Sequence, residues 1–164
     1  MASCCSKKLT ERKGNMIKVS TQKLPTGEPW DCKEKSKIVK IFISHSKTIH
    51  SIQFVYVNDN GDLTLSERYG SERGDILKTV ILNYPSEFLT SVGGKYDGSR
   101  NALTSIVFTT NIDRYGLFGS PERDDTEFNF DLGKDSSFGG FHGTTTKIGL
   151  ESIGVYINPF TKKP

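Results

Sequence analysis

The side chains that could carry out chemistry are few in this chain and lie far apart. His45 and His50 stand on either side of the start of one apolar run, and His142 lies within a glycine-rich run. Each could in principle serve as a general base, but no G-x-S-x-G, H-E-x-x-H or P-loop lysine motif accompanies them. A lone histidine on a strand is more often a structural residue. The sequence therefore argues against an enzyme.

The cysteine and aspartate residues that could bind a metal ion also lack the required spacing. Cys4 and Cys5 are adjacent and Cys32 stands alone, so the chain contains no cysteine pair with zinc spacing. Asp124 and Asp125 lie in a polar stretch without the alternating oxygen ligands and glycine turn that calcium requires. We expect a solvated loop there, and neither a metal nor any other cofactor.

Size and composition describe the kind of scaffold that must hold any site. The chain has 164 residues, of which 34% are hydrophobic and 25% charged, with a net charge of +3. A chain of this length can bury about 70% of its extended surface, which supports one domain without disulfide staples. No apolar run is long enough for a signal peptide or an integral membrane segment, and no Asn-x-Ser/Thr sequon occurs. We expect a cytoplasmic protein, with the nucleus as the alternative compartment.

The basic residues are concentrated at the start of the chain. Residues 1–47 hold eleven Lys or Arg and four Asp or Glu, whereas residues 48–164 hold eleven and fifteen. Residues 1–16 are expected to be a basic, disordered leader. The alternative is a contact with a membrane surface or nucleic acid, helped by acylation of Cys4 and Cys5. Because the body is acidic and its aromatic residues alternate at strand spacing, we expect no nucleic-acid partner.

Apolar residues recur with a period of two, which is typical of strands. In 50–56, Ile52, Phe54 and Tyr56 share one face, while Ser51 and Gln53 point the other way. Similar runs occur at 38–43, 63–68, 76–82, 88–96, 102–109, 126–131 and 150–157. Glycine, asparagine and aspartate separate them at turn-like intervals. The pattern predicts an all-β sandwich, barrel or prism.

A weak internal repeat narrows this choice. Ser-Ile occurs at 51–52, 105–106 and 152–153, at intervals near 50 residues, and an asparagine follows each copy. Three copies predict three equivalent β units of about four strands around a pseudo-threefold axis. Ile52, Ile106 and Ile153 would then be equivalent core positions. Coincidence is the alternative, since a serine before an apolar strand is common. Rigid loops at the end of such a scaffold, rich in backbone amides and carrying one carboxylate, suit neutral polyols such as sugars.

Several blocks of the sequence, in order, resemble the jacalin-related lectins. They include Trp30-Asp31, the run from Tyr84 to Tyr96, Gly139-Gly140-Phe141-His142-Gly143 and Ile153-Gly154-Val155-Tyr156. The resemblance spans residues 17–158 and leaves 159–164 as a tail. It implies a β-prism I fold with three four-stranded antiparallel sheets. It also implies a plant protein of the cytoplasmic, mannose-binding branch, acting in defence or stress.

The resemblance also locates a sugar site. In the family a G-x-x-x-D motif before the last strand supplies a carboxylate to two sugar hydroxyls, and a glycine-rich loop near the N-terminus assists. The corresponding residues here are Lys147, Ile148, Gly149, Leu150 and Glu151, together with Gly27 in the N-terminal loop. Asp97, in the turn Asp97-Gly98-Ser99, is a further candidate for sugar binding.

Both defining positions of that motif differ in this chain. Glu151 adds a methylene to the expected aspartate, and Lys147 replaces a glycine, which would strain a backbone with positive φ. We therefore expect weak mannose binding or none. The altered loop is most similar to the jacalin-type proteins that restrict systemic plant-virus movement. In that alternative the prism is an interaction module for host or viral proteins. Pairing of edge strands into a homo-oligomer is a further expectation from the family.

Overall fold

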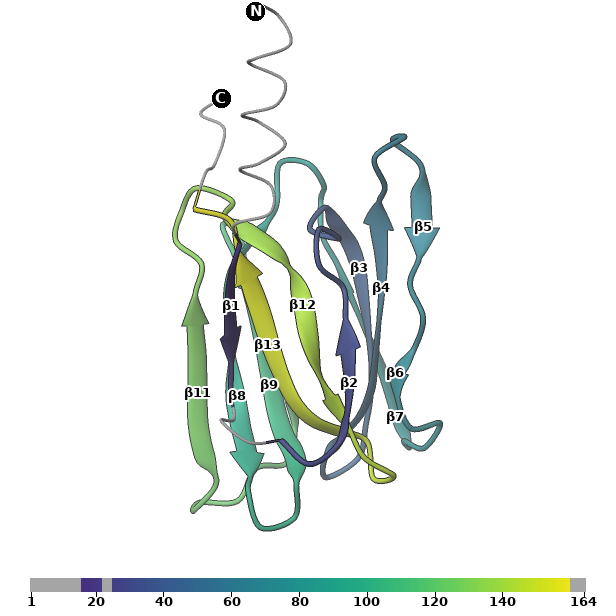
Figure 1. Ribbon diagram of the computed structural model, residues 1–164, viewed down its shortest axis with the longest axis vertical. Helices are drawn as coiled ribbons and strands as arrows, with labels where there is room; N and C mark the ends of the chain where they lie inside the picture. The colour runs from purple at the N-terminus through teal and green to yellow at the C-terminus, as the bar shows by residue number, and fades with distance from the viewer. Residues whose placement is uncertain (1–15, 22–24, 160–164) are drawn as a thin grey trace, which may run out of the picture.

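The computed structural model describes residues 16–21 and 25–159. Within these ranges the regular structure consists of thirteen strands without a helix, as the period-two pattern predicts (Figure 1). The described residues accordingly contain no helix long and apolar enough to cross a membrane. The predictions about a disordered leader and about acylation at Cys4 and Cys5 lie outside the described residues.

The strands form three antiparallel sheets. Sheet one has the order β1 (Ile17–Ser20), β13 (Leu150–Ile157), β12 (Phe138–Thr145), β2 (Glu28–Asp31). Sheet two has the order β5 (Leu63–Leu65), β4 (Ile49–Val57), β3 (Ile38–His45), β7 (Ile76–Ile81), and β6 (Tyr69–Gly70) also pairs with β4. Sheet three has the order β10 (Arg114–Gly119), β9 (Ala102–Thr110), β8 (Leu89–Asp97), β11 (Thr126–Asp131).

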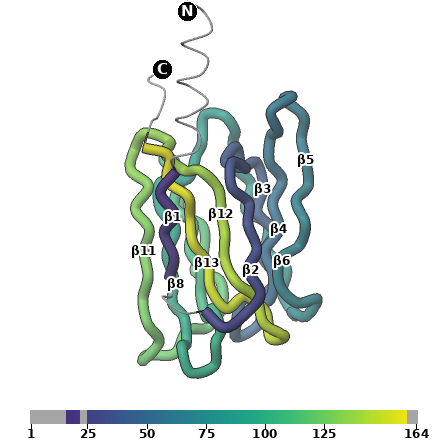
Figure 2. The backbone as a smooth tube through the Cα atoms, in the orientation of Figure 1, coloured from purple at the N-terminus to yellow at the C-terminus, as the bar shows by residue number. Residues whose placement is uncertain are grey.

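Each sheet is built on the same plan, which confirms the threefold prediction. A central hairpin (β3–β4, β8–β9 or β12–β13) is flanked on its first strand by β7, β11 or β2, and on its second by β5 and β6, β10 or β1. All three hairpins carry a register shift near the turn, between Ser44 and His45, Lys95 and Tyr96, and Thr144 and Thr145. The three turns lie at one end of the molecule, which we call the hairpin end (Figure 2).

Sheet two departs from the four-stranded plan at one edge. The position that β10 or β1 fills in the other sheets is divided there between the short strands β5 and β6. Between them, Ser66 donates its backbone N–H to the carbonyl of Phe54 (2.8 Å), and its hydroxyl accepts from the N–H of Phe54 (2.9 Å). These bonds hold the interrupted strand against β4.

The core lies where the inner faces of the three sheets meet. Ile52, Ile106 and Ile153 are each 0% exposed, as the repeat predicts. Phe141 of sheet one stacks on Phe54 of sheet two at 4.8 Å and meets Phe108 of sheet three edge-on at 6.1 Å. Because each sheet contributes to a single cluster, the prism folds around one core, and its loops are free to form sites at the ends.

Candidate functional site

The structure brings most of the predicted sugar-site residues together at the hairpin end. Gly27 leads into β2, and residues 147–149 form the turn between β12 and β13, on which Leu150 and Glu151 follow. Asp97 also lies at the hairpin end, but as the last residue of β8 in sheet three, directly before the β8–β9 turn. There its carboxylate accepts bonds from Ser99 and Arg100 of its own turn. These hydrogen bonds hold the pKa of Asp97 well below its ordinary value.

Glu151, the predicted sugar-binding carboxylate, is fully buried and already bonded. One oxygen accepts from the backbone N–H groups of Thr26 (2.8 Å) and Gly27 (3.1 Å) and from the hydroxyl of Thr144 (3.0 Å). The other accepts from the Thr26 hydroxyl at 2.7 Å. Its side chain is 0% exposed. Burial alone would raise the pKa of Glu151, but these four hydrogen bonds outweigh it, and the pKa lies below its ordinary value.

The amides bonded to Glu151 come from the same loop that, by resemblance, helps to bind sugar in the family. Gly27 packs so closely that a Cβ there would lie 2.2 Å from the carbonyl oxygen of Thr145. The carboxylate of Glu151 therefore lies under Thr26 and Gly27. The carboxylate binds the chain's own loop and presents no oxygen to solvent.

The turn before Glu151 is fixed to sheet two. Gly149 has φ of +150°, and a Cβ there would lie 2.7 Å from the Cα of His50 and from the carbonyl oxygen of Ile49. The carbonyl of Ile148 accepts bonds from the His50 ring (2.9 Å) and from the Ser71 hydroxyl (3.2 Å). The turn is thus held on β4 and beside β6.

The backbone strain expected at Lys147 is absent, which corrects that prediction. Lys147 is not among the residues with positive φ. The residue of this turn that has a positive φ is Gly149, a glycine, which adopts it without strain. Lys147 and Ile148 (47% exposed) face solvent, while Leu150 belongs to the core. The motif residues therefore do not converge on an open pocket.

The pseudo-threefold relation places Glu151 at a position that is polar in all three sheets. Glu151 occupies the register shift of its hairpin, directly before Ser152, and His50 and Thr104 hold the same place before Ser51 and Ser105. His50 bonds to Ser46 (2.6 Å), and the Thr104 hydroxyl donates to Asp125 (2.7 Å). In every sheet this position holds a polar side chain that fastens neighbouring loops to the hairpin end.

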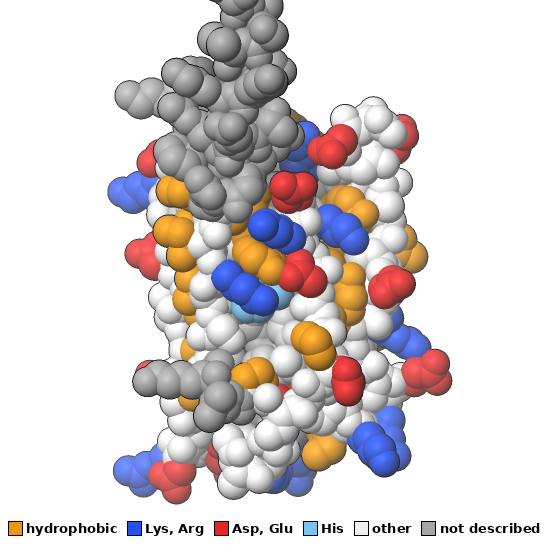
Figure 3. Space-filling model, in the orientation of Figure 1, with side chains coloured by type: hydrophobic (Ala, Val, Ile, Leu, Met, Phe, Trp, Pro, Cys, Tyr) orange, Lys and Arg blue, Asp and Glu red, His pale blue; other side chains and the backbone are white. Residues whose placement is uncertain are grey.

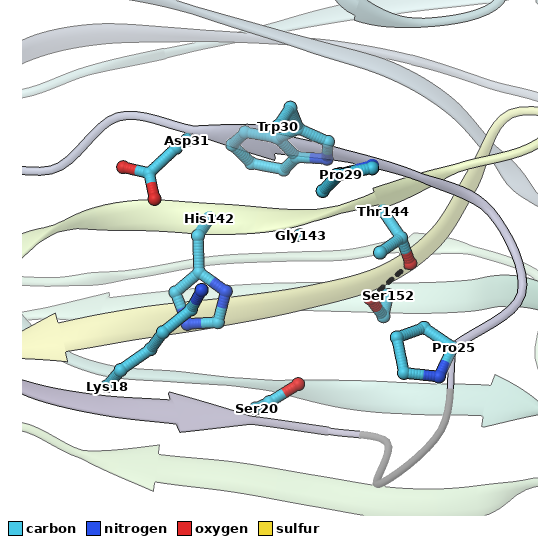
Figure 4. A pocket seen from close by; sticks show the side chains of 10 residues that line it. All are labelled: Lys18, Ser20, Pro25, Pro29, Trp30, Asp31, His142, Gly143, Thr144 and Ser152. Carbon is cyan, nitrogen blue, oxygen red and sulfur yellow. Dashed lines mark hydrogen bonds between the residues drawn. The ribbon is translucent and has the colours of Figure 1, made fainter.

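A groove of about 340 Å³ lies on the outer face of sheet one, where none of the predicted site residues lines it (Figure 4). Its floor includes His142, Gly143, Thr144 and Ser152 of β12 and β13, and Lys18 of β1 stands beside His142. Figure 3 faces this sheet and shows basic, acidic and histidine side chains gathered at its centre. Sequence reasoning missed the groove, although His142 and Thr144, and likewise Ser152 and Gly154, lie two residues apart on their strands and so share one polar outer face.

The titratable groups of this groove are engaged within the protein. Burial lowers the pKa of His142, whose Nε2 lies 2.7 Å from the carbonyl oxygen of Val19. The Tyr156 hydroxyl donates to Asp31, and its pKa is raised by burial and by that hydrogen bond. Among the described residues, no group of three or more His, Cys, Asp or Glu side chains could hold a metal ion.

Comparison with known proteins agrees with this architecture. The model of the jacalin-like lectin domain family matches residues 21–156. The chain belongs to the jacalin-like lectin family. Two Arabidopsis thaliana relatives, "Protein RESTRICTED TEV MOVEMENT 1" and its "Inactive" namesake, are each 44% identical over 131 residues, which covers 77% of this chain and 75% of theirs.

More distant jacalin-like relatives are named for sugar binding. A mannose/glucose-specific lectin of Parkia pendula is 31% identical over 140 residues, covering 82% of this chain and 30% of that protein. The crystal structure of an artocarpin–mannopentose complex matches with a TM-score of 0.73 and 27% identity, covering 87% of this chain and 97% of that one. The jacalin-like fold is therefore shared with lectins that bind mannose.

Proposed function

We propose that this jacalin-like domain is a non-enzymatic protein-recognition module and does not bind mannose through its family sugar site. The observation that carries the proposal is the burial of Glu151 under the loop that contains Thr26 and Gly27. Both carboxylate oxygens accept hydrogen bonds there, one from Thr26, Gly27 and Thr144 and the other from the Thr26 hydroxyl. A sugar hydroxyl could reach this carboxylate only by displacing bonds from buried or backbone donors. Each broken bond to a charged group costs about 1.5–3 kcal/mol.

We further propose that this protein is cytoplasmic and restricts the movement of a plant virus. Its support is the 44% identity with "RESTRICTED TEV MOVEMENT 1" over three quarters of both chains. The active and the inactive Arabidopsis relatives are equally similar, so identity alone does not separate them. The partner would be a host or viral protein recognised by the surface of the prism.

Calorimetric titration with methyl α-mannoside and mannotriose tests the first part. We expect only heats of dilution from this protein, while the Parkia lectin, titrated in parallel, gives saturable heats. Saturable binding that Glu151→Ala abolishes would contradict the proposal, since the carboxylate would then be serving a sugar. The second part is tested by expressing the chain in susceptible plants and measuring the systemic movement of TEV, the virus in the name of the Arabidopsis relative. Unimpeded movement of the virus would count against the antiviral role.

A further inference from the structure

Two lysine side chains cover one tyrosine on the outer face of sheet one. The Nζ of Lys18, in β1, lies 5.8 Å from the centre of the Tyr156 ring, and the Nζ of Lys33, just after β2, lies 5.7 Å from it. The oxygens of Asp31 accept from the Lys33 backbone N–H (2.7 Å) and from the Tyr156 hydroxyl. Within residues 16–21 and 25–159, neither exposed lysine forms an ion pair. Two ammonium groups thus meet over one ring without a counter-ion from the described chain.

The pseudo-threefold relation shows that the fold does not require this pair of charges. Backbone hydrogen bonds on either side of Lys33 continue the β2–β12 pairing and set it opposite Gly140. The equivalent rows across the three sheets are Lys33, Gly140, Tyr156, Lys18 in sheet one, Asp131, Ser91, Thr109, Arg114 in sheet three, and Ile81, Lys40, Val55, Leu65 in sheet two. The two ends of the row are oppositely charged in sheet three and aliphatic in sheet two, but both positive in sheet one. An anion held between the two lysines would offset their mutual repulsion.

The groove of about 340 Å³ adjoins this charged pair. Lys18 and His142 line it beside Tyr156, and Figure 4 shows Pro25 and Pro29 farther toward the hairpin end. Trp30 adds apolar surface between them. The volume is at the lower end for ligand pockets, which is enough for a side chain or two of a bound chain. The face therefore combines a cationic half with a half whose walls are apolar.

The floor of the groove has little to offer an anion. The Thr144 hydroxyl donates its one hydrogen to the Glu151 carboxylate (3.0 Å), so Ser152 must be the donor in the 2.6 Å bond between the Thr144 and Ser152 hydroxyls. The hydrogens of both floor hydroxyls are thus used within the protein. Recognition of negative charge falls to the two lysines.

We propose that this face of sheet one binds an extended acidic segment of a partner protein. One carboxylate of the segment lies between Lys18 and Lys33 over Tyr156, and an apolar side chain two residues along enters the groove beside Pro29. Alternate side chains of an extended chain point to the same side, about 6.6 Å apart, which matches a charged half next to an apolar one. The inference rests on the proposed protein-recognition role and gives it a surface and a partner chemistry.

A nucleic acid fits the same face less well. Tyr156 and Trp30 are only 5% and 9% exposed, so neither presents the open ring on which a nucleobase would stack. Asp31, which is exposed beside the lysines, would repel a run of phosphates. A short peptide with separated carboxylates avoids both difficulties.

Fluorescence anisotropy on the full chain tests the proposal with a labelled eight-residue peptide that alternates glutamate and leucine. We expect saturable binding that weakens as ionic strength rises. The peptide with glutamine in place of glutamate should bind roughly tenfold more weakly or worse, as should the glutamate peptide to Lys18→Gln/Lys33→Gln. The control Lys78→Gln/Lys95→Gln removes the same charge from β7 and β8 and should bind like the wild type.

Three results would overturn the proposal: no saturable binding of the glutamate peptide, equal binding of the glutamine peptide, or unchanged binding by Lys18→Gln/Lys33→Gln. Tighter binding of an eight-nucleotide oligouridylate that needs the same two lysines would also overturn it, in favour of nucleic acid. Circular dichroism checks that the variants are folded. The mannoside titration separates this inference from the proposed function, since mannose binding would refute the function, whereas silence toward both mannoside and peptide would refute only this surface.

Discussion

At the residue scale, Glu151 stabilises the fold through its four hydrogen bonds, which leads to a graded prediction. Glu151→Gln keeps an acceptor for Thr26, Gly27 and Thr144 but loses the charge, so we expect the free energy of unfolding to fall by roughly 1 kcal/mol. Glu151→Ala leaves buried donors without an acceptor and should cost roughly 3 kcal/mol. Urea denaturation measures both, and equal stability of all three proteins would show that these bonds contribute nothing.

The pH dependence of the free energy of unfolding, compared between the wild type and Glu151→Gln, provides a control. The folded pKa of Glu151 lies below its ordinary value, so the charged form is favoured by folding. The advantage of the wild type over Glu151→Gln should therefore be fully present above the unfolded pKa of about 4.3 and disappear as pH falls through the lower folded pKa. An advantage that instead grew on acidification would show that the folded state prefers the protonated acid.

Sequence reasoning found this residue but not its role. The resemblance marks Glu151 as the motif carboxylate, and the added methylene predicts a changed site. That the side chain would reach Thr26 and Gly27 could not be derived, because it depends on how a segment 125 residues away folds over the hairpin. The groove at His142 escaped detection for a similar reason, since four strands from both ends of the chain build it.

At the element scale, the β12–β13 turn depends on the glycine at position 149. Gly149→Ala introduces a Cβ at φ +150°, 2.7 Å from backbone atoms of β4, so we expect a loss of about 2 kcal/mol or more. Gly98 provides the matched control, because it also lies in a hairpin-end turn and a Cβ there meets nothing within 4 Å. Thermal or urea unfolding compares them, and similar losses for both alanine variants would contradict the packing described here.

Turns were harder to predict than strands. Period-two alternation located β3, β4, β5, β7, β8, β9, β11 and β13, but β10 and β12 were not among the predicted runs. The interruption between β5 and β6 depends on the bonds of Ser66 to Phe54. Lys147 shows the same limit. The family motif suggested a strained conformation there, but the turn uses Gly149 for it.

At the scale of the whole molecule, the three sheets share one core and should respond alike to the same change. Ile52, Ile106 and Ile153 are each fully buried at equivalent positions, so each isoleucine-to-alanine variant should lose about 2–5 kcal/mol, with the three values within about 1 kcal/mol of one another. Unfolding should remain a single transition. A variant that lost far less than the other two, or unfolded in two steps, would show that one sheet folds apart from the rest.

The repeat that predicted this symmetry consists of only a few residues, Ser-Ile in each unit and a following asparagine. It was sufficient because the serine directly follows the register shift and the isoleucine is the central core residue, both of which the architecture needs in every sheet.

We expect the loop that contains Thr26 and Gly27 to remain closed over Glu151 when sugar is present. The most direct measurement is a two-dimensional ¹H–¹⁵N NMR titration with methyl α-mannoside, following the amides of Thr26 and Gly27, which donate to that carboxylate. We expect both resonances to keep their positions up to about 50 mM sugar. A saturable shift of both, accompanied by shifts at Gly149, would mean that sugar enters the site, and would contradict the claim that Glu151 serves only the fold.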